Sequence, residues 1–347
     1  MYTREESLDG LTFHTIPIEQ VKADAERIGV FQPQADHNTA RNHTTADKAA
    51  AGTNDDAGTA AGTCTDPAIR IEWRDMSPAD RTGFISAVQC LLSRPSAGDG
   101  TNYPGSQNRY EDLVAVHQQL TSTIHMVGQF LPWHRYFLSI YESLLRQECG
   151  LTGPMPWWDE AKDAGNFGAS PLFTDEYFGP LPAKTADGQS TCLTTGPFTM
   201  TLHIGPGGGQ TDHCLSRGVD ESLMSQCSAD FSNYCNSYTD YSDMEKCAEG
   251  GPHAYCHNGI GAVMADVASS VGDPVFFMHH SFIDHSWRIW QNADAARLTQ
   301  IDGATSSDGS GVLNLDYVLT SRGLRPDVTV RDVMDTMGGY LCYRYSY

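Results

Sequence analysis

The sequence lacks a long apolar run, a CxxC cysteine pair and an excess of basic residues. No stretch approaches the length that spans a membrane, so a membrane is not an expected partner. Lys and Arg number 22 against 43 Asp and Glu, which gives a formal net charge of -21. Because so acidic a chain repels phosphate backbones, no nucleic-acid partner is expected either. The missing CxxC pair argues against a zinc knuckle or a thioredoxin-type motif.

The cysteines number ten, an even count. We interpret most of them as disulfides formed in an oxidising compartment, the alternative being scattered buried thiols. Their spacing does not reveal which cysteine pairs with which. The first ten residues carry four charges and no apolar stretch. We therefore expect a secreted, extracellular protein from which a signal peptide has been removed, rather than an intracellular one.

The N-terminal part of the chain differs in composition from the rest. Residues 36–63 are rich in Ala, Thr, Asn, Asp and Gly and lack bulky apolar side chains, which is typical of a linker or loose arm. Residues 11–35 are mixed and could be a docking arm or part of a pro-segment. We assign residues 1–63 to an N-terminal extension and 64–347 to one compact domain.

Two further segments help to describe the compact domain. A helix is predicted within residues 71–92, with Ser77 as its N-cap and Pro78 at its first position. Residues 151–250 are rich in Gly, Pro and Cys and show few periodic stretches. They are expected to form long, disulfide-linked loops over a helical core.

Three histidines lie in one stretch at positions that predict inward-facing side chains. Apolar residues at helical spacing place His117 on the buried face of a helix, with His125 near its end. Pro132 interrupts this pattern. A second helix should start around Trp133, carry His134 beside its apolar face and end at the Cys149-Gly150 pair.

A second stretch carries the other candidate ligands. His253 and His257 are one helical turn apart, a spacing that allows both imidazoles to bind one ion. Asp273-Pro274 predicts the start of another helix, with Asp as N-cap and Pro at the first position. His280 and Asp284 share one face of that helix.

Six inward-facing histidines suggest metal binding. A single histidine on an apolar face is more often a satisfied core residue. Burying six imidazoles without partners, however, would cost on the order of several kcal/mol, and metal coordination removes that cost. Imidazole ligands suit copper, zinc, iron or nickel. Three imidazoles per ion leave a coordination position open for a reactant.

Longer motifs resemble those of a known family. The pattern His125-x4-Phe130-Leu131-x-Trp133-His134-Arg135-x2-Leu138-x3-Glu142 resembles the first copper motif of the tyrosinase and catechol oxidase (polyphenol oxidase) family. The pattern Asp273-Pro274-x-Phe276-Phe277-x2-His280-x3-Asp284 resembles its second copper motif. Four shorter segments are similar to fungal members: Arg70–Arg74, Pro156–Asp159, Cys214–Arg217 and Tyr343–Tyr345. The resemblance extends from Cys64 to the C-terminus.

The resemblance implies a mainly α fold, in which a four-helix bundle holds a binuclear copper site among long disulfide-linked loops with little β structure. It implies two copper ions per chain and dioxygen as co-substrate. One copper would be bound by His117, His125 and His134, and the other by His253, His257 and His280. The family pattern selects His280 over the adjacent His279, for which a supporting or structural role is expected.

The reaction that the resemblance implies is oxidation of catechols to ortho-quinones with reduction of dioxygen to water. The expected partner is a small phenolic or diphenolic substrate, and the expected state is a monomer or weak homodimer. Glu249 or Glu245 could hold a water that deprotonates the phenol, the alternative for each being a solvated loop charge. Asp284 is expected to orient a ligand, and Phe276 and Phe277 to pack beside the ligands. The residues expected to contact substrate are Ala254, Asn258 and Met264.

Three departures from the family pattern refine these expectations. Thr123 stands where many members have a cysteine that crosslinks to a ligand, so no such thioether is expected. Ala254 stands where enzymes that hydroxylate monophenols often have Asn, so we expect diphenol oxidation to dominate. The chain ends two residues after Tyr345, without a shielding C-terminal domain, so the site should be open unless the N-terminal arm covers it.

Other functions remain possible from the sequence. Within enzymes, the alternatives are a tyrosinase that hydroxylates monophenols and an ortho-aminophenol oxidase, because both act through the same pair of metal ions. Outside enzymes, they are a reversible oxygen carrier of the hemocyanin type and a structural, zinc-loaded protein.

Overall fold

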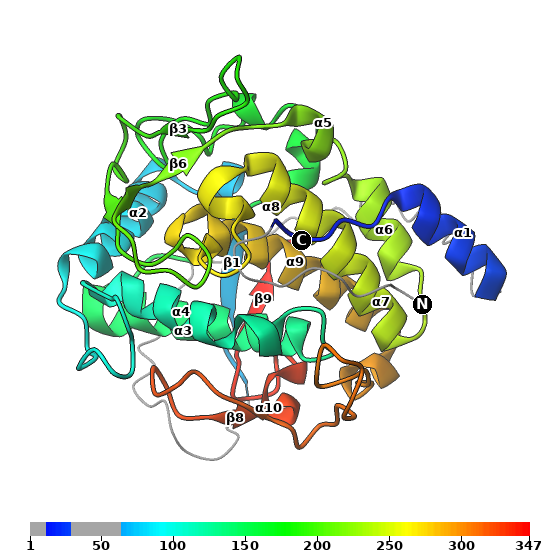
Figure 1. Cartoon of the computed structure of the whole chain (residues 1–347). Coiled ribbons are helices and arrows are strands. Elements are labelled where there is room, and N and C mark those ends of the chain that lie inside the picture. Colours follow the sequence, from blue (N-terminus) through cyan, green and yellow to red (C-terminus); the bar gives the residue numbers. More distant parts are fainter. Residues whose placement is uncertain (1–11, 29–63) are drawn as a thin grey trace.

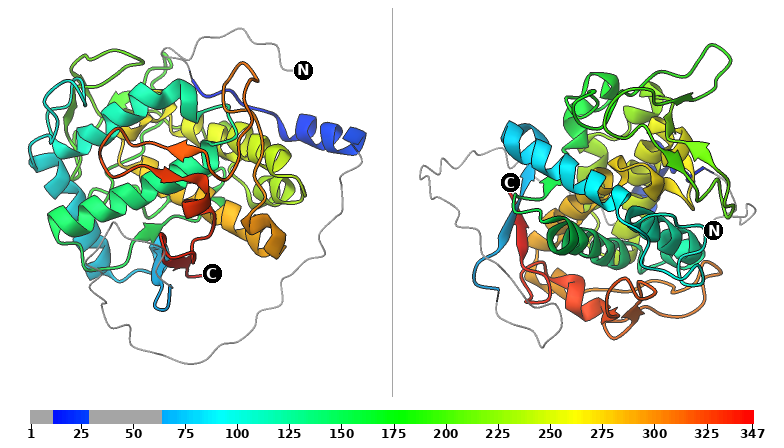
Figure 2. Two further views of the ribbon diagram at one scale, coloured as in Figure 1. Left: turned by 90° about the horizontal axis from the view of Figure 1, so that it is seen from below. Right: turned by 90° about the vertical axis from the view of Figure 1, so that its left-hand side faces the viewer.

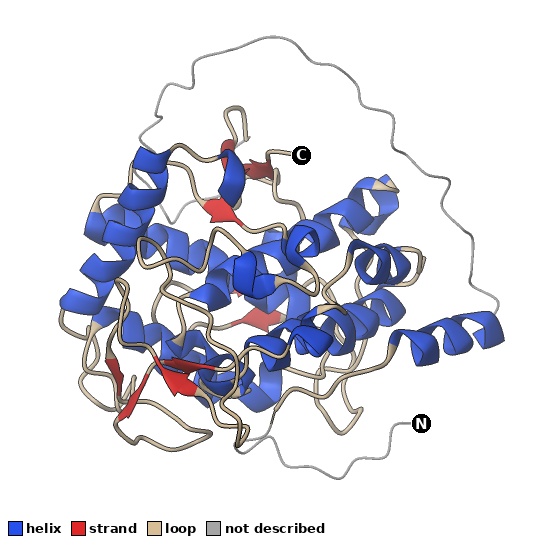
Figure 3. Cartoon of the chain, turned by 90° about the horizontal axis from the view of Figure 1, so that it is seen from above, coloured by secondary structure: helices blue, strands red, loops and turns tan. Residues whose placement is uncertain are grey.

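Helices make up most of the regular structure, and strands are few and short (Figure 3). The computed structural model describes residues 12–28 and 64–347. The expected mainly α fold is therefore confirmed. The predicted linker at residues 36–63 lies outside the described residues.

Four helical segments form the centre of the molecule (Figure 1). The long helices α4 and α9 pack against each other, α3 lies beside α4, and the short α8 follows a π-helical turn, η4, that contacts α9. The expected four-helix bundle is confirmed. The turn η4 and helix α8 are continuous and together make one of the four segments. The bounds are Arg109–Ile124 for α3, Phe130–Cys149 for α4, Glu249–His253 for η4, Ala254–Ile260 for α8 and Val275–Asn292 for α9.

The ends of α3 and α4 follow from local sequence. The side chain of Asn108 accepts the backbone amide of Glu111 at 2.9 Å and so caps α3. Helix α4 ends at Cys149, and Gly150 caps it, as predicted. Gly150 has φ 67°, and its amide donates to the carbonyl groups of Arg146 and Leu145. Its start differs from the prediction, because Pro132 lies within its first turn. A proline is tolerated there, since the first-turn amides have no partner in the helix.

Further helices surround the bundle. Helix α2 begins after Ser77, whose side chain accepts the amide of Asp80 at 3.1 Å, as predicted. The expectation of loops throughout residues 151–250 is wrong for the segment that holds α5, α6 and α7. These helices have eight residues or fewer, too few turns for apolar periodicity to be visible. Their bounds are Pro78–Ser93 for α2, Glu221–Met224 for α5, Ala229–Asn236 for α6, Tyr241–Ala248 for α7 and Val330–Met334 for α10.

The largest sheet has three strands and joins distant parts of the chain. Strand β1 (Ala68–Glu72) is central and pairs in parallel with β2 (Pro156–Trp157) and β9 (Tyr343–Tyr345). Figure 2 shows this sheet at the side of the bundle, close to the C-terminus. The other strands form two-residue antiparallel pairs: β3 (Thr191–Cys192) with β6 (Ser216–Arg217), β4 (Thr201–Leu202) with β5 (His213–Cys214), and β7 (Val318–Leu319) with β8 (Val328–Thr329).

All ten cysteines are paired, which confirms the interpretation as disulfides. The bond between Cys227 and Cys256 fixes α8 to the segment that follows α5. The remaining four disulfides are Cys64–Cys342, Cys90–Cys149, Cys192–Cys214 and Cys235–Cys247.

Residues 12–28 form an arm that docks on the compact domain. Its helix α1 (Ile18–Ile28) projects from the side of the molecule near α6, and the extended residues before it run toward α8 (Figure 1). The amide of Ile16 donates to the carbonyl of Gly250 at 2.7 Å. Ile16 and Val21 are buried in the main core. The described part of this segment is docked on the domain, and such contacts fit both sequence-based alternatives, a docking arm and part of a pro-segment.

Candidate metal centre

The first histidine cluster is built by α3 and α4. His117 lies on the buried face of α3, His125 follows the last residue of that helix, and His134 lies in the second turn of α4. One nitrogen atom of each ring lies within 4.8 Å of the others, and all three side chains are buried. Each Nδ1 donates to a backbone carbonyl oxygen, which fixes the tautomer and directs Nε2 away. The acceptors are Ala268 at 2.9 Å, Thr121 at 3.1 Å and Phe130 at 2.8 Å.

The second cluster contains four histidines, all buried: His253, His257, His279 and His280. They come from η4, α8 and α9. The Nδ1 atom of His253 donates to the carbonyl of Glu249 at 3.1 Å, and that of His257 to the carbonyl of Met264 at 2.6 Å. Backbone carbonyl groups therefore orient these two imidazoles in the same way as the three imidazoles of the first cluster.

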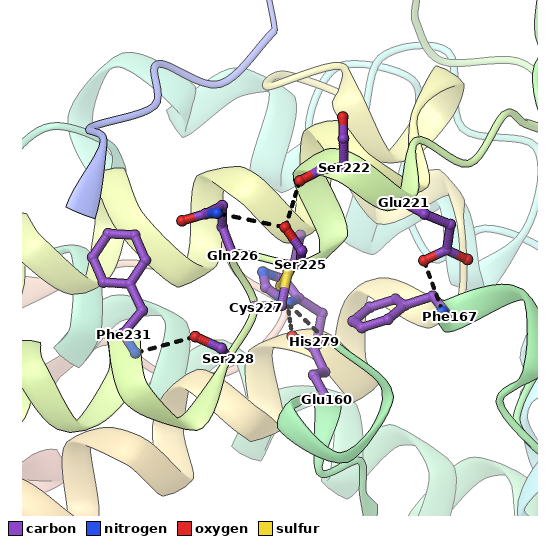
Figure 4. Close-up of a disulfide and its surroundings, with 11 residues drawn as sticks. Glu160, Phe167, Glu221, Ser222, Ser225, Gln226, Cys227, Ser228, Phe231 and His279 are labelled. Carbon is purple, nitrogen blue, oxygen red and sulfur yellow. Dashed lines mark hydrogen bonds and ion pairs between the residues drawn. A yellow bond between two sulfur atoms is a disulfide. The ribbon is translucent and has the colours of Figure 1, made fainter. Parts of the chain in front are cut away.

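The adjacent histidines of α9 differ in their surroundings. Nδ1 of His279 contacts both carboxylate oxygens of Glu160, at 2.9 and 3.0 Å, and Figure 4 shows the two side chains pointing toward each other beside Cys227. The ring of His280 instead stacks on His134 of the first cluster, with centroids 4.4 Å apart. Its Nε2 lies 3.3 Å from Nε2 of His257. His280 thus contacts both clusters, whereas His279 is held by a carboxylate.

The donor atoms of these clusters fit metal ions. The Nε2 atoms of five buried histidines have no hydrogen-bond partner within the described part of the chain: His117, His125, His134, His253 and His279. An unpartnered buried nitrogen is costly unless an ion binds it. Burial lowers the pKa of His117, His125, His134 and His253, to about 4 for His117, so these four imidazoles are neutral near pH 7. Neutral imidazoles are the form that binds copper.

Two buried carboxylates, Glu245 of α7 and Glu249 of η4, stand shortly before His253 in the chain. Burial raises the pKa of Glu249 to about 7, even though its Oε1 accepts the amide of Met126 at 2.7 Å. Burial and the charge of Glu249 raise the pKa of Glu245 well above its usual value. Both residues are nearly inaccessible to solvent, so the alternative of solvated loop charges is wrong for both.

The role expected for Asp284 needs correction. Although it lies one turn from His280, its carboxylate accepts hydrogen bonds from Arg135 and from the hydroxyl groups of Tyr343 and Tyr345. Within the described residues its side chain bonds no histidine. Asp284 therefore ties the C-terminal strand β9 to the bundle instead of orienting a ligand. The carboxylate that does contact an imidazole of the site is Glu160.

The two phenylalanines of the second motif have different neighbours. Phe276 stacks on His280 with centroids 4.0 Å apart and lies 5.3 Å from His117, so it packs beside two of the expected ligands. Phe277 stacks instead on Tyr141 at 3.6 Å. It packs one layer farther from the histidines than expected.

The residues expected to contact substrate have the following surroundings. Ala254 is buried in a small apolar cluster with Phe13 and Val267. The side chain of Asn258 bonds the backbone of Phe13. Met264 is fully buried, and its carbonyl orients His257. Two of the three positions are thus covered by the N-terminal arm.

Sequence reasoning missed two residues of the site. Glu160 directly follows the Pro156–Asp159 motif, and its place after a family motif was the one available signal. Phe13 stands in a short apolar segment with no periodicity, so no local signal distinguished it.

The fold and the site together define a helical bundle built to hold two metal ions between buried histidines. Comparison with known proteins agrees: residues 107–293 match the common central domain of tyrosinase. The chain belongs to the tyrosinase family of type 3 copper proteins and is a copper oxidoreductase of the tyrosinase and polyphenol oxidase type, which acts on phenols.

Similar proteins are mostly fungal. A tyrosinase-like protein, phomQ1, of Diaporthe leptostromiformis is 34% identical, and the match covers 82% of this chain and 78% of that protein. Tyrosinase P of Aspergillus terreus is 30% identical over 82% of this chain and 93% of its own length. A variant polyphenol oxidase from Thermothelomyces thermophila matches in structure with a TM-score of 0.75 and 28% identity, covering 81% of this chain and 89% of that chain.

The similarity to more distant members is limited to the fold. A functional unit of octopus hemocyanin superposes with a TM-score of 0.51 at 19% identity, over 81% of this chain and 68% of the hemocyanin unit. Among the described residues, no helix is both long enough and apolar enough to cross a membrane.

Proposed function

We propose that this protein oxidises ortho-diphenols to ortho-quinones and hydroxylates monophenols weakly or not at all. The observation that carries the proposal is the residue next to His253. Ala254 offers only a methyl group, buried against Phe13 and Val267. A monophenol must lose its proton before its ring can be hydroxylated, and Ala254 provides no polar group to position a water between the phenol and an acceptor. A catechol presents two adjacent oxygen atoms and needs no hydroxylation.

We propose that His117, His125 and His134 hold one copper ion and that His253, His257 and His280 hold the second. When bound, the copper pair supplies the electron transfer between the diphenol and dioxygen. Each catechol loses two electrons and two protons, so two catechols reduce one dioxygen to two waters. Carbonyl groups fix five of the six imidazoles, which keeps the donor atoms aimed at common points before metal arrives.

The protein must also accept the substrate's protons. Glu249 is the candidate acceptor, because its buried carboxylate accepts a hydrogen bond from Met126, the residue after His125, and its pKa of about 7 suits proton transfer near neutral pH. Glu245 lies beside Glu249 and has a pKa raised well above the usual value. It is the group that would receive the proton next from Glu249. Phe276, stacked on His280 and close to His117, excludes water from that side of the histidines.

The test is a comparison of two substrates on the copper-loaded protein. We expect rapid oxidation of 4-methylcatechol and a rate at least about tenfold lower on para-cresol, with a lag before quinone appears. His134→Ala should abolish both activities and serves as the control for copper dependence. Faster turnover of para-cresol than of 4-methylcatechol, without a lag, would contradict the proposal.

We further propose that the protein is exported from the cell. The support is the pairing of all ten cysteines, since five disulfides in one chain are typical of an oxidising compartment. Fractionation of a producing culture, with detection of the intact chain in the medium, tests this. The expected monomer or weak homodimer stays a prediction.

A further inference from the structure

An aromatic side chain of the N-terminal arm lies against the second histidine cluster. The ring of Phe13 stacks on His257 with centroids 4.0 Å apart and an angle of 26° between the planes. It also meets His253 edge-on at 5.0 Å. His125 of the first cluster lies 5.8 Å from the same ring. Phe13 therefore contacts both clusters at once, and its side chain is buried.

The backbone of Phe13 is held by a polar side chain of α8. Its amide donates to Oδ1 of Asn258 at 3.0 Å, and its carbonyl accepts Nδ2 of the same side chain at 2.6 Å. One amide side chain thus satisfies both backbone groups of one arm residue. This pairing fixes the position of the Phe13 ring over His257.

A second attachment lies three residues farther along the arm. The amide of Ile16 donates to the carbonyl of Gly250, and the side chain of Ile16 packs so closely on Gly250 that a Cβ atom there would meet it at 2.5 Å. Ile16 is buried in the main core. The arm is therefore docked through specific contacts at Phe13 and again three residues after it.

The contacts of Phe13 coincide with the positions expected to contact substrate. Ala254 and Val267 pack on its ring, and Asn258 bonds its backbone. A planar ring that approaches the copper ligands from this side needs the same volume. A phenolic substrate and the Phe13 ring cannot occupy it together.

From this geometry we propose that the arm is an intramolecular inhibitor, with Phe13 in the place of the substrate ring. The surface formed by η4 and α8 binds an extended segment of the chain that carries one aromatic side chain, and residues 12–17 are its occupant. Substrate must displace this segment before it reaches the metal centre. The proposal rests on the proposed function only in naming the displaced substrate as a diphenol.

An inhibitor of this kind has a kinetic signature. Only the fraction of molecules with a displaced arm can bind substrate, so the apparent KM rises by the reciprocal of that fraction while kcat is unchanged. Because the inhibitor is part of the same chain, its local concentration is high and dilution does not weaken it. Loss of the Phe13 ring should therefore lower KM without raising kcat.

The experiment compares the copper-loaded full chain with three variants. Phe13→Ala removes the ring, Ile16→Ala weakens docking without removing the ring, and His14→Ala changes an exposed neighbour and is the matched control. We expect KM for 4-methylcatechol to fall about tenfold in Phe13→Ala and by less in Ile16→Ala. His14→Ala should retain the wild-type KM, and kcat should be equal in all four proteins.

A second measurement does not depend on turnover. Benzoate, an aromatic acid that the enzyme cannot oxidise, is added at saturation while amide hydrogen exchange is followed in residues 12–17. Displacement of the arm predicts faster exchange at Phe13 and Ile16, whose amides are bonded in the docked state. In Phe13→Ala, benzoate should bind about tenfold more tightly than in the wild type.

The outcomes separate the two proposals. Unchanged KM and unchanged benzoate affinity in Phe13→Ala would overturn the inhibitory role, as would a lower kcat at constant KM, which indicates a structural role. If no variant oxidises 4-methylcatechol but benzoate still accelerates exchange in the arm, the proposed reaction fails and the inhibitory contact stands. If Phe13→Ala does not fold, the exchange of the wild-type arm with and without benzoate decides.

Discussion

The carboxylate of Glu249 accepts the backbone amide of Met126 at 2.7 Å. Met126 directly follows His125 of the first cluster and has φ 57°, a left-handed backbone conformation that residues other than glycine rarely adopt. The backbone carbonyl of Glu249 accepts Nδ1 of His253 of the second cluster at 3.1 Å. One residue thus connects the two histidine clusters, and its side chain holds a strained turn beside one of the expected ligands.

Glu249→Gln should separate the two functions of this residue. The amide oxygen of Gln can still accept the Met126 amide, so the fold and the copper content should be retained. Gln cannot take up a proton, so kcat for 4-methylcatechol should fall about 100-fold. Steady-state kinetics and copper analysis on the same sample measure both effects.

The matched control is Glu245→Gln, which changes the neighbouring buried carboxylate. We expect a smaller loss of kcat there, because Glu245 is proposed to receive the proton only after Glu249 has accepted it from the substrate. Wild-type kcat in Glu249→Gln would show that another group accepts the substrate's protons.

The adjacent histidines of α9 predict different metal contents. His280 lies between His134 and His257, so His280→Ala should leave one copper per chain and no oxidase activity. His279 is bonded to the buried carboxylate of Glu160, so His279→Ala should retain two coppers with lower activity. Metal analysis after gel filtration distinguishes the two. Loss of copper from His279→Ala, with two coppers retained in His280→Ala, would reverse the assignment.

Much of the histidine arrangement was predictable because helical spacing is local. His117 follows the apolar period of α3, and His253 and His257 are one turn apart. Periodicity could not choose between His279 and His280, since adjacent residues on a helix that is buried on all sides both face protein. The family motif made that choice. The strand contact of Tyr343 and Tyr345 with Asp284 was not predictable, because it joins positions about 60 residues apart.

The arm shows the same limit more strongly. Composition suggested that residues 11–35 either dock or belong to a pro-segment, but no local rule predicts that Phe13 reaches His257 across a separation of more than 200 residues. Contacts of this kind depend on the complete tertiary fold. The short helices α5 to α7 were missed for a different reason, since each has eight residues or fewer and too few buried apolar positions for helical periodicity to be recognised.

Asp284→Asn should lower stability and change its dependence on pH. Burial disfavours the charged carboxylate, but Arg135 and Arg70 outweigh burial and hold the pKa of Asp284 below its usual value. A carboxyl whose pKa is depressed in the folded state stabilises the protein above the unfolded pKa of about 3.9, and this contribution is lost as the pH falls through the folded value. Removing one partner of a buried ion pair costs about 3–5 kcal/mol.

Urea denaturation of the copper-free protein between pH 7 and pH 3 measures this effect. The variant should be less stable at pH 7, and the difference from the wild type should shrink below about pH 4. The matched control is Asp316→Asn, which changes an exposed carboxylate paired with Arg331 and should leave stability within about 0.5 kcal/mol. A constant difference at every pH would show that the charge of Asp284 is not responsible.

The disulfide beside the site should affect copper binding as well as stability. Cys256 immediately precedes His257, and its partner Cys227 closes a loop with a sequence separation of 29. Replacing both cysteines with Ser should lower the free energy of unfolding by about 3 kcal/mol, since the unfolded chain gains freedom. Because α8 then loses an anchor next to His257, one of the proposed ligands, copper should also dissociate at a lower chelator concentration.

The disulfide between Cys192 and Cys214 provides the comparison, since it has a similar sequence separation of 22 and joins segments at the surface. Its double Ser variant should lose a similar amount of stability and keep the wild-type resistance to chelator. Chelator titration with copper analysis, beside urea denaturation of each copper-free variant, measures the two quantities separately. If both variants release copper at the same chelator concentration, the effect follows from global stability, and the bond at Cys256 has no specific role in holding His257.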